Sequence, residues 1–261
     1  MTKSSPIIIA LCGKGGVGKT SISALLTKIL CQDSSKKILA IDADPAVGLA
    51  SALGIQVKLT VDDIRNNFIS RIKAGEKIDK KEIMSRLDYE MFEAISEKAN
   101  CAFLAIGRPE QDGCYCQVNH LLKDIIKEIA SNFDYVVIDG EAGIEQVNRR
   151  VMEMVTHLLL ISDASAKGRN VIANINDVAL KAIDTHFCGV ILNRLKDESE
   201  FNRLKQHIKL PLIGWIPEDE NLRLFDVEGL NFWNFPASPA LLSLQTLLNQ
   251  FLIKKSNNSF L

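Results

Sequence analysis

Residues 13–20 combine glycines, two lysines and a threonine at a spacing that can bind phosphate groups. The glycines leave backbone N–H groups open to phosphate oxygens. Lys19 can then reach the outer phosphates of a nucleotide, and the Thr20 hydroxyl can bind Mg²⁺. A glycine turn without a ligand is the alternative, but every position that the phosphate motif requires is filled. The predicted phosphate-binding residues are Gly13, Lys14, Gly15, Gly16, Val17, Gly18, Lys19, Thr20 and Ser21.

Aspartates follow two apolar segments that have the pattern of buried strands. Asp44 comes after the segment 37–42, and Asp139 ends the segment 135–139. Carboxylates at the carboxyl ends of parallel strands face the crevice in which ligands bind. Asp139 has the position of a carboxylate that reaches Mg²⁺ directly or through water. We therefore predict a magnesium site formed by Thr20, Asp44 and Asp139, and aspartates that only end turns are the alternative.

Cys114 and Cys116 form a second feature with possible chemistry, at the start of a predicted helix. A helix N-terminus lowers the pKa of a thiol and favours the thiolates that bind metals. Two thiolates do not complete a four-coordinate site, but a nearby two-fold axis would add the same pair from a second subunit. Zn²⁺, Ni²⁺ and Cu⁺ all suit such a site. The alternative is a pair of unliganded surface cysteines, and His120 is either an auxiliary ligand or a helix-surface histidine.

Alternating apolar segments predict the elements that position these residues. Strands are predicted at 7–12, 37–42, 101–107, 135–139, 157–161, 187–192 and 212–216, and helices at 18–30, 117–130, 169–183 and 240–253. This alternation predicts an α/β fold, a mostly parallel sheet with helices on both faces. Residues 56–100 are less legible and are interpreted as surface helices or a mobile insertion. No repeat or linker divides the chain, so we expect one domain over residues 1–261.

The composition is that of an ordinary globular protein. Of the 261 residues, 47% are hydrophobic and 24% are charged, and the net charge is −1. A near-neutral chain is not expected to bind nucleic acid electrostatically. No apolar run reaches the roughly 18 residues of a membrane span, so we expect a cytoplasmic protein that does not bind membranes. Cys12, Cys31, Cys101 and Cys188 lie in or beside apolar runs and are expected to be buried thiols.

Lys14 is a second lysine that an ordinary phosphate-binding loop does not require. In this feature the chain resembles the deviant Walker A family, which includes septum-site and plasmid-partition ATPases, the nitrogenase iron protein and metal-insertase ATPases. The resemblance implies a nucleotide-sandwich homodimer in which Lys14 reaches the phosphates bound by the partner. ATP hydrolysis would then depend on Lys14, Lys19 and Asp44, with Asp44 orienting the attacking water.

The same resemblance implies two further groups of nucleotide contacts. Gly143 lies at the aspartate-to-glycine spacing of the second switch, where its N–H would sense the γ-phosphate. Asn193, Arg194 and Pro217 follow two later strands and correspond to the adenine side of the site. An asparagine that only caps a turn is the alternative for Asn193.

Residues 107–120 resemble the metal-site segment of CooC-type ATPases, which mature the nickel–iron centre of carbon monoxide dehydrogenase. Residues 138–145 resemble their second switch, and the resemblance is weakest at 56–100. It implies an ATP-hydrolysing homodimer whose shared Cys114 and Cys116 pairs bind nickel or zinc. Hydrolysis would be coupled to nickel insertion into carbon monoxide dehydrogenase or a related nickel enzyme. The alternatives are an ATPase with an iron–sulfur cluster and a positioning or partition ATPase.

Overall fold

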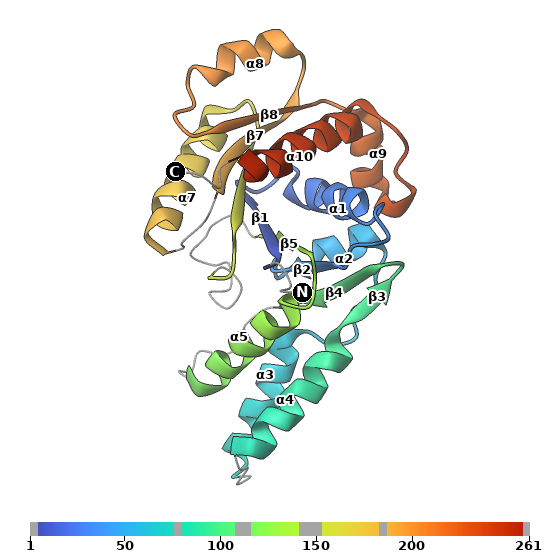
Figure 1. Ribbon diagram of the computed structural model, residues 1–261, viewed down its shortest axis with the longest axis vertical. Helices are drawn as coiled ribbons and strands as arrows, with labels where there is room; N and C mark the ends of the chain where they lie inside the picture. Colours follow the sequence, from blue (N-terminus) through green and yellow to red (C-terminus); the bar gives the residue numbers. More distant parts are fainter. Residues whose placement is uncertain (1–4, 76–79, 108–115, 141–152, 183–186, 258–261) are drawn as a thin grey trace.

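The computed structural model describes residues 5–75, 80–107, 116–140, 153–182 and 187–257. Within these residues the chain forms one sheet of eight strands with helices packed against it (Figure 1). The strands are β1 (Ile7–Gly13), β2 (Ile38–Asp42), β3 (Ser96–Lys98), β4 (Cys101–Ala105), β5 (Tyr135–Asp139), β6 (His157–Ser162), β7 (Phe187–Leu195) and β8 (Leu212–Pro217).

The strand order in the sheet is β3-β4-β2-β5-β1-β6-β7-β8. β1 pairs in parallel with β5 on one side and with β6 on the other. Every neighbouring pair is parallel except β3 and β4, which are antiparallel. The predicted mostly parallel sheet is therefore confirmed. Because parallel strands end at one edge, the segments that follow β1, β2 and β5 leave the sheet at the same edge.

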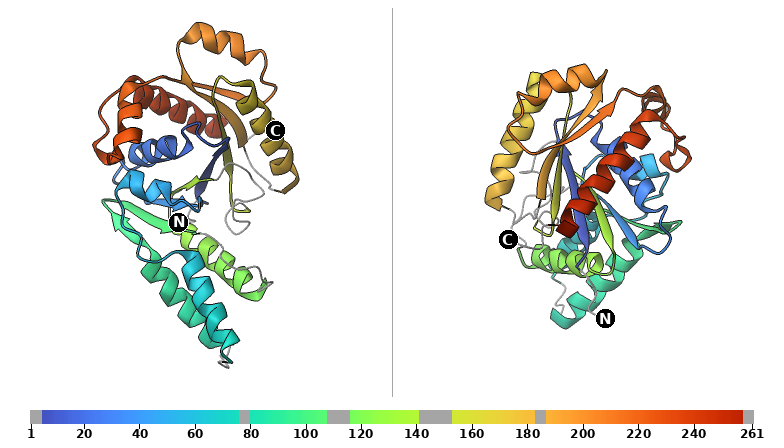
Figure 2. Two further views of the ribbon diagram at one scale, coloured as in Figure 1. Left: turned by 180° about the vertical axis from the view of Figure 1, so that it is seen from behind. Right: turned by 45° about the horizontal axis from the view of Figure 1, so that its top comes forward.

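Helices cover both faces of the sheet, as predicted (Figure 2). One face is covered by α1 (Lys19–Leu30), α2 (Gly48–Leu53), α9 (Glu220–Glu228), the 3₁₀ helix η1 (Phe232–Asn234) and α10 (Pro239–Asn257). The other face is covered by α3 (Val61–Lys73), α4 (Lys80–Ala94), α5 (Cys116–Ala130), α7 (Ala166–Ala182) and α8 (Glu198–Lys205).

The strand β1 shows why the central segments are apolar without interruption. Ile9 and Leu11 belong to the hydrophobic core on one face, and Ile8 and Ala10 belong to the core on the other. All four side chains are buried, because helices lie on both sides of the sheet. Such strands have continuous apolar runs and not the alternation of a half-exposed strand.

Residues 56–100 contain α3, α4 and β3, so the interpretation of this region as helical is correct. Thr60 and Asp63 form a reciprocal capping box that starts α3. Phe68 of α3 and Leu87 and Met91 of α4 are fully buried in the core. Each of these helices therefore has one face toward the core and one toward the surface. The scattered apolar residues of the sequence form the face that is buried.

Element ends differ from the sequence-based ranges at a few places. β7 continues to Leu195, past the predicted end at residue 192, and the short helices α2, α8 and α9 were not predicted. These helices have only six, eight and nine residues, which is too short for a clear apolar period. Among the described helices, none combines the length and the hydropathy that a membrane span requires.

Candidate functional site

The glycine-rich loop joins β1, inside the sheet, to the N-terminus of α1. Gly13 lies so close to β6 that a Cβ atom there would be 2.1 Å from the carbonyl oxygen of Ile161. Gly16 and Gly18 have φ angles of +80° and +89°, a conformation that favours glycine. Gly18 is the N-cap of α1, so the loop directs backbone N–H groups and the positive end of the helix dipole toward one place. That is the arrangement of an anion site.

Lys19 and Thr20, the first two residues of α1, point to the same place. The Lys19 side chain is only 8% exposed, and its Nζ donates to the carbonyl of Lys14 at 3.3 Å. Thr20 Oγ1 donates to Asp139 Oδ2 at 2.7 Å, and Ser23 Oγ donates to Asp139 Oδ1 at 3.0 Å. The structure thus brings the predicted threonine and aspartate of the magnesium site into direct contact.

Two buried carboxylates lie side by side at the ends of β2 and β5. Asp42 and Asp139 are register partners and are 0% and 1% exposed. Burial, with the charge of Asp139 adding to it, raises the pKa of Asp42 to about 7. Burial also raises the pKa of Asp139 to about 6. A nearby cation would offset this cost, and hydroxyl and carboxylate oxygens are ligands that Mg²⁺ accepts. The oxygen ligands present at this place therefore fit a magnesium ion.

Asp42 holds the loop that carries Asp44. Asp42 Oδ2 accepts from the N–H groups of Leu49 at 2.8 Å and Ala50 at 3.3 Å, in the first turn of α2. Asp42 Oδ1 accepts from the Asp44 N–H at 3.2 Å. Asp44 in turn accepts from the Ala46 N–H at 2.8 Å and lines the cavity next to the phosphate loop. The sequence analysis assigned no role to Asp42, which here has a positioning role.

Lys14 contacts the segment that follows β6. Its Nζ lies 3.4 Å from Asp163 Oδ2, and both side chains are 30% exposed. Burial raises the pKa of Asp163, but hydrogen bonds from Ser165 and the Lys14 ammonium outweigh it and hold the pKa below its ordinary value. In this single chain Lys14 is thus paired within its own subunit.

Two of the three predicted adenine-side residues, Asn193 and Arg194, contact the phosphate loop. The buried Asn193 side chain donates from Nδ2 to the Val17 carbonyl at 2.8 Å, and its Oδ1 has no partner among the described residues. Arg194 has a left-handed φ of 59° and donates from Nη1 to the Gly16 carbonyl at 3.1 Å. Pro217 ends β8 opposite Leu195. The Nδ2 of Asn193 is thus hydrogen-bonded to the loop, and among the described residues its Oδ1 remains available as an acceptor.

A cavity of about 550 Å³ lies over the phosphate loop. Its walls come from the loop, α1, the Asp44 loop, α2, α9 and η1. Eight of the predicted site residues line this cavity, namely Gly15, Gly16, Gly18, Lys19, Thr20, Ser21, Asp44 and Arg194. Asp226 of α9 also lines it and accepts from Ser21 Oγ at 2.6 Å. This cavity has the size and the donors that a nucleotide requires.

The cysteine pair is only partly described. Cys114 and Gly143 lie outside the described residues, and Cys116 is the first residue of α5. His120 is exposed, and its Nε2 lies 3.6 Å from Asp124 Oδ2. Within the described residues no group of three or more His, Cys, Asp or Glu side chains is arranged to hold a metal ion.

The other four cysteines are free thiols. Burial raises the pKa of Cys12 to about 12 and that of Cys188 to about 11. A hydrogen bond with Cys101, together with burial, also raises the pKa of Cys31. High pKa values make these thiols poor metal ligands and poor nucleophiles at neutral pH. Cys12 and Cys101 are buried as predicted, and Cys31 and Cys188 are half-buried.

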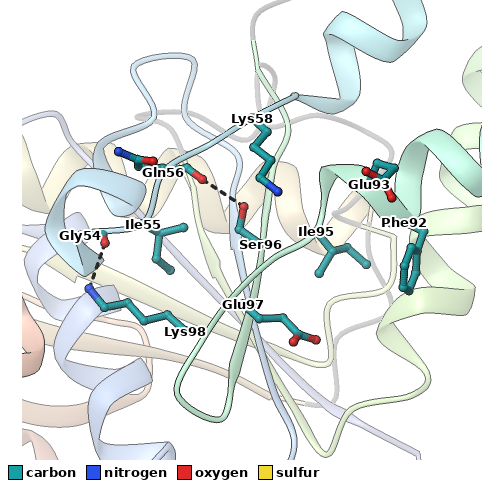
Figure 3. Close-up of a pocket in the computed structure, with 10 residues that line it drawn as sticks. All are labelled: Gly54, Ile55, Gln56, Lys58, Phe92, Glu93, Ile95, Ser96, Glu97 and Lys98. Atoms are coloured by element: carbon teal, nitrogen blue, oxygen red, sulfur yellow. Dashed lines mark hydrogen bonds between the residues drawn. The ribbon is translucent and has the colours of Figure 1, made fainter.

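Another cavity, of about 540 Å³, lies away from the phosphate loop, between the end of α2, the end of α4 and β3 (Figure 3). Ser96 Oγ donates to the Gln56 carbonyl at 3.1 Å, and Lys98 Nζ donates to the carbonyls of Leu53 at 3.0 Å and Gly54 at 2.9 Å. The Lys98 ammonium therefore stabilises the C-terminal end of α2. Among the described residues, none of the predicted site residues lines this cavity, so it is not a candidate for the nucleotide.

Comparison with known proteins agrees with this geometry. The family described as CobQ/CobB/MinD/ParA nucleotide binding domain matches residues 8–232, which include the phosphate loop and the ends of β2 and β5. The chain belongs to this nucleotide-binding family. The deviant Walker A assignment is therefore confirmed at the level of the family.

Two relatives with similar sequences have different descriptions. An uncharacterized ATP-binding protein of Methanocaldococcus jannaschii is 37% identical over 242 residues, which cover 88% of this chain and 92% of that protein. The carbon monoxide dehydrogenase accessory protein CooC of Rhodospirillum rubrum is 28% identical over 242 residues, covering 89% and 90%. Both similarities agree with membership of the nucleotide-binding family.

Among solved structures, the fold is similar to the septum site-determining protein MinD of Pyrococcus horikoshii complexed with Mg-ADP. The TM-score is 0.68 at 22% identity, and the match covers 94% of this chain and 96% of that one. This likeness shows the fold of the family.

Sequence reasoning missed three acidic residues of the site, namely Asp42, Asp163 and Asp226. Asp42 is visible in the sequence as the last residue of the predicted strand 37–42, two positions before Asp44. Asp163 follows β6, and its contact with Lys14 depends on β6 being the neighbour of β1. Asp226 lies on a helix of only nine residues that gave no clear pattern.

Proposed function

We propose that this chain is an ATP-hydrolysing metallochaperone. Its nucleotide-dependent homodimer binds nickel through Cys114 and Cys116 of both subunits and assists nickel insertion into carbon monoxide dehydrogenase or a related nickel enzyme. Membership of the nucleotide-binding family supports the ATP-dependent part. The similarity to CooC and the pair of cysteines within residues 107–120 support the metal-dependent part.

The phosphate loop and α1 bind the triphosphate. Backbone N–H groups of Gly15, Gly16 and Gly18 donate to phosphate oxygens, and Lys19 neutralises charge on the outer phosphates. Thr20 and Asp139, which are hydrogen-bonded at 2.7 Å, would hold Mg²⁺ together with Asp44. When bound, the ion supplies charge neutralisation to the phosphates.

Hydrolysis requires a water molecule held in line with the outer phosphate. Asp44 orients this water, since its carboxylate lines the phosphate-loop cavity and its loop is fixed by Asp42. Lys14 leaves Asp163 and reaches the phosphates bound by the partner subunit, where it stabilises the charge of the transition state. Gly143 senses the γ-phosphate, and Asn193, Arg194 and Pro217 bind the adenine side.

One observation carries the coupling between the two sites. The Ile106 N–H donates to the Asp42 carbonyl at 2.8 Å, one residue before Gly107, at which the cysteine segment begins. Asp42 also holds the loop of Asp44. The start of the segment that leads to Cys114 and Cys116 is therefore hydrogen-bonded to the same strand end that positions Asp44. A change at Asp44 on hydrolysis would be passed to the cysteine segment through this strand end.

Metal titration of the purified protein, with and without ATP, tests this function. We expect a dimer that holds about one nickel or zinc ion when ATP is present, because four thiolates complete one site. A variant with Cys114→Ser and Cys116→Ser is expected to bind no metal while it still binds ATP. Bound metal is measured by elemental analysis, and the oligomeric state is measured by light scattering on the same samples.

Cys188→Ser is the matched control, because its half-buried thiol has a raised pKa and lies on β7. This variant is expected to bind metal as the unmodified protein does. A monomer that binds no metal in any nucleotide state would contradict the proposed function, and so would a double cysteine variant that retains about one nickel per dimer.

The role of Lys14 makes a separate prediction. Lys14→Gln is expected to lower the rate of ATP hydrolysis about 10²-fold, because it removes one charged donor from the transition state. The affinity of the monomer for ADP should change less than about threefold, since Lys14 contacts Asp163 and not its own nucleotide cavity. Phosphate release and ADP titration measure the two effects.

Lys167→Gln provides the control for Lys14. Lys167 is exposed on α7, and it is not among the residues that line the phosphate-loop cavity. Its hydrolysis rate should equal that of the unmodified protein. If Lys14→Gln hydrolysed ATP at the unmodified rate, the action of Lys14 across a dimer would be excluded.

A further inference from the structure

Asp226 lies between two cavities on the nucleotide side of the molecule. The first is the phosphate-loop cavity of about 550 Å³, and the second has about 500 Å³. The second cavity is lined by residues that follow β8 and by α9, including Glu218, Asp219 and Arg223. Arg194 and Asp226 line both cavities, so these two side chains form the partition between them.

The Asp226 carboxylate ties three segments together across this partition. Its Oδ1 accepts from Ser21 Oγ at 2.6 Å, and its Oδ2 lies 3.3 Å from Arg194 Nη2. Arg194 also donates to the Gly16 carbonyl at 3.1 Å. A carboxylate of α9 thus contacts α1 directly and the phosphate loop through an arginine. Among the described residues, no other carboxylate contacts both Ser21 and Arg194.

The donors that Asp226 occupies are those that a nucleotide needs. Ser21 follows Thr20 in the first turn of α1, and a guanidinium binds either a phosphate or the edge of a base. A nucleotide with its phosphates in the first cavity and its base in the second must pass between Ser21 and Arg194. A carboxylate that holds both groups closes this passage, so a ligand that reaches both cavities must replace the contacts of Asp226, whereas a ligand confined to the phosphate loop need not.

We propose that Asp226 is an internal competitor of the nucleotide, which must displace the carboxylate from Ser21 and Arg194 to occupy both cavities. The proposal rests on the nucleotide-binding part of the proposed function and not on the metal. The ligand class is a nucleoside di- or triphosphate that reaches both cavities. Inorganic tripolyphosphate needs only the phosphate-loop cavity and leaves the partition in place.

The competition is modest because the ion pair is partly hydrated. The Arg194 and Asp226 side chains are 43% and 31% exposed. Ion pairs of this kind stabilise a structure weakly, so we expect removal of the charge to tighten nucleotide binding about fivefold. Asp226→Asn keeps the shape of the side chain and an acceptor oxygen for Ser21, but it releases the guanidinium of Arg194.

Calorimetric titration with ADP and with tripolyphosphate tests the proposal. The buffer is first freed of metal ions, and only Mg²⁺ is then added. Asp226→Asn should bind ADP about fivefold more tightly than the unmodified protein, while its affinity for tripolyphosphate changes less than about twofold. Glu228→Gln is the matched control, because it removes one carboxylate from the exposed end of the same helix. Its affinity for ADP should not change.

Weaker or unchanged ADP binding by Asp226→Asn would overturn the proposal, because the carboxylate would then support the nucleotide site. Equal tightening for ADP and tripolyphosphate would also overturn it, since Asp226 would then act only as a distant charge. Asp226→Ser serves as a second variant if the asparagine variant does not fold. Loss of nickel binding leaves this result unaffected, so failure of the metal-dependent function is distinguished from failure of this inference.

Discussion

Replacement of Lys19 by methionine is expected to lower the rate of ATP hydrolysis about 10³-fold. Lys19 is only 8% exposed, and its ammonium lies at the phosphate loop, where its charge is poorly screened by water. Its loss leaves the charge on the outer phosphates without a nearby partner in the same subunit. Phosphate release under saturating ATP measures the rate, and equilibrium titration measures the accompanying loss of affinity.

Lys36→Met is the control for Lys19→Met. Lys36 lies before β2, 41% exposed, with its Nζ 4.0 Å from Asp134 Oδ1. Such a surface pair contributes little, so hydrolysis should stay within about twofold of the unmodified rate. A Lys19→Met protein that hydrolysed ATP as fast as the Lys36→Met protein would show that the outer phosphates do not bind at this loop.

Replacement of Gly13 by alanine is expected to lower the free energy of unfolding by about 3–5 kcal/mol. A Cβ at Gly13 would lie 2.1 Å from the carbonyl oxygen of Ile161 and 3.1 Å from its carbonyl carbon. These are backbone atoms of β6, so the clash cannot be relieved by a side-chain rotation. β1 and β6, which pair next to each other inside the sheet, would have to separate. Denaturant unfolding measures the change.

Gly15→Ala is the matched control in the same loop. Within the described part of the chain, no heavy atom beyond Gly15 and its two chain neighbours lies within 4 Å of a Cβ at Gly15, and its φ angle is not in the left-handed range. Its free energy of unfolding should change by less than about 1 kcal/mol. Equal stability of the two alanine variants would mean that β1 and β6 are not as close as described.

The architecture was predictable because each central strand is a continuous apolar run. Residues 7–12 and 135–138 are apolar on both faces, a pattern typical of strands covered by helices on both sides of a sheet. The strand β3 is different, since its three residues, Ser96–Lys98, are polar or charged and their pattern gives no signal. Its antiparallel pairing with β4 comes from the tight turn between them and is not visible in an apolar pattern.

Most of the phosphate side of the site could be inferred because its residues are contiguous. Gly13 to Ser21 form one strand–loop–helix unit, and the backbone geometry of such a unit is set by local sequence. Asp139 was predictable for a related reason, because it ends an apolar strand. The structure then shows that Thr20 and Asp139 are hydrogen-bonded at 2.7 Å, a contact that the spacing of residues in the sequence does not reveal.

The sequence by itself determined the strand–loop–helix unit, the extra lysine and the carboxylates at the ends of predicted strands. Only the tertiary structure decided which of the described residues meet them: Asp163 meets Lys14 because β6 lies beside β1, and Asp226 meets Ser21 because α9 packs near α1. The physical reason is that local motifs follow from backbone conformation, whereas these acidic partners depend on strand order and helix packing. Such contacts join residues 149 and 205 positions apart.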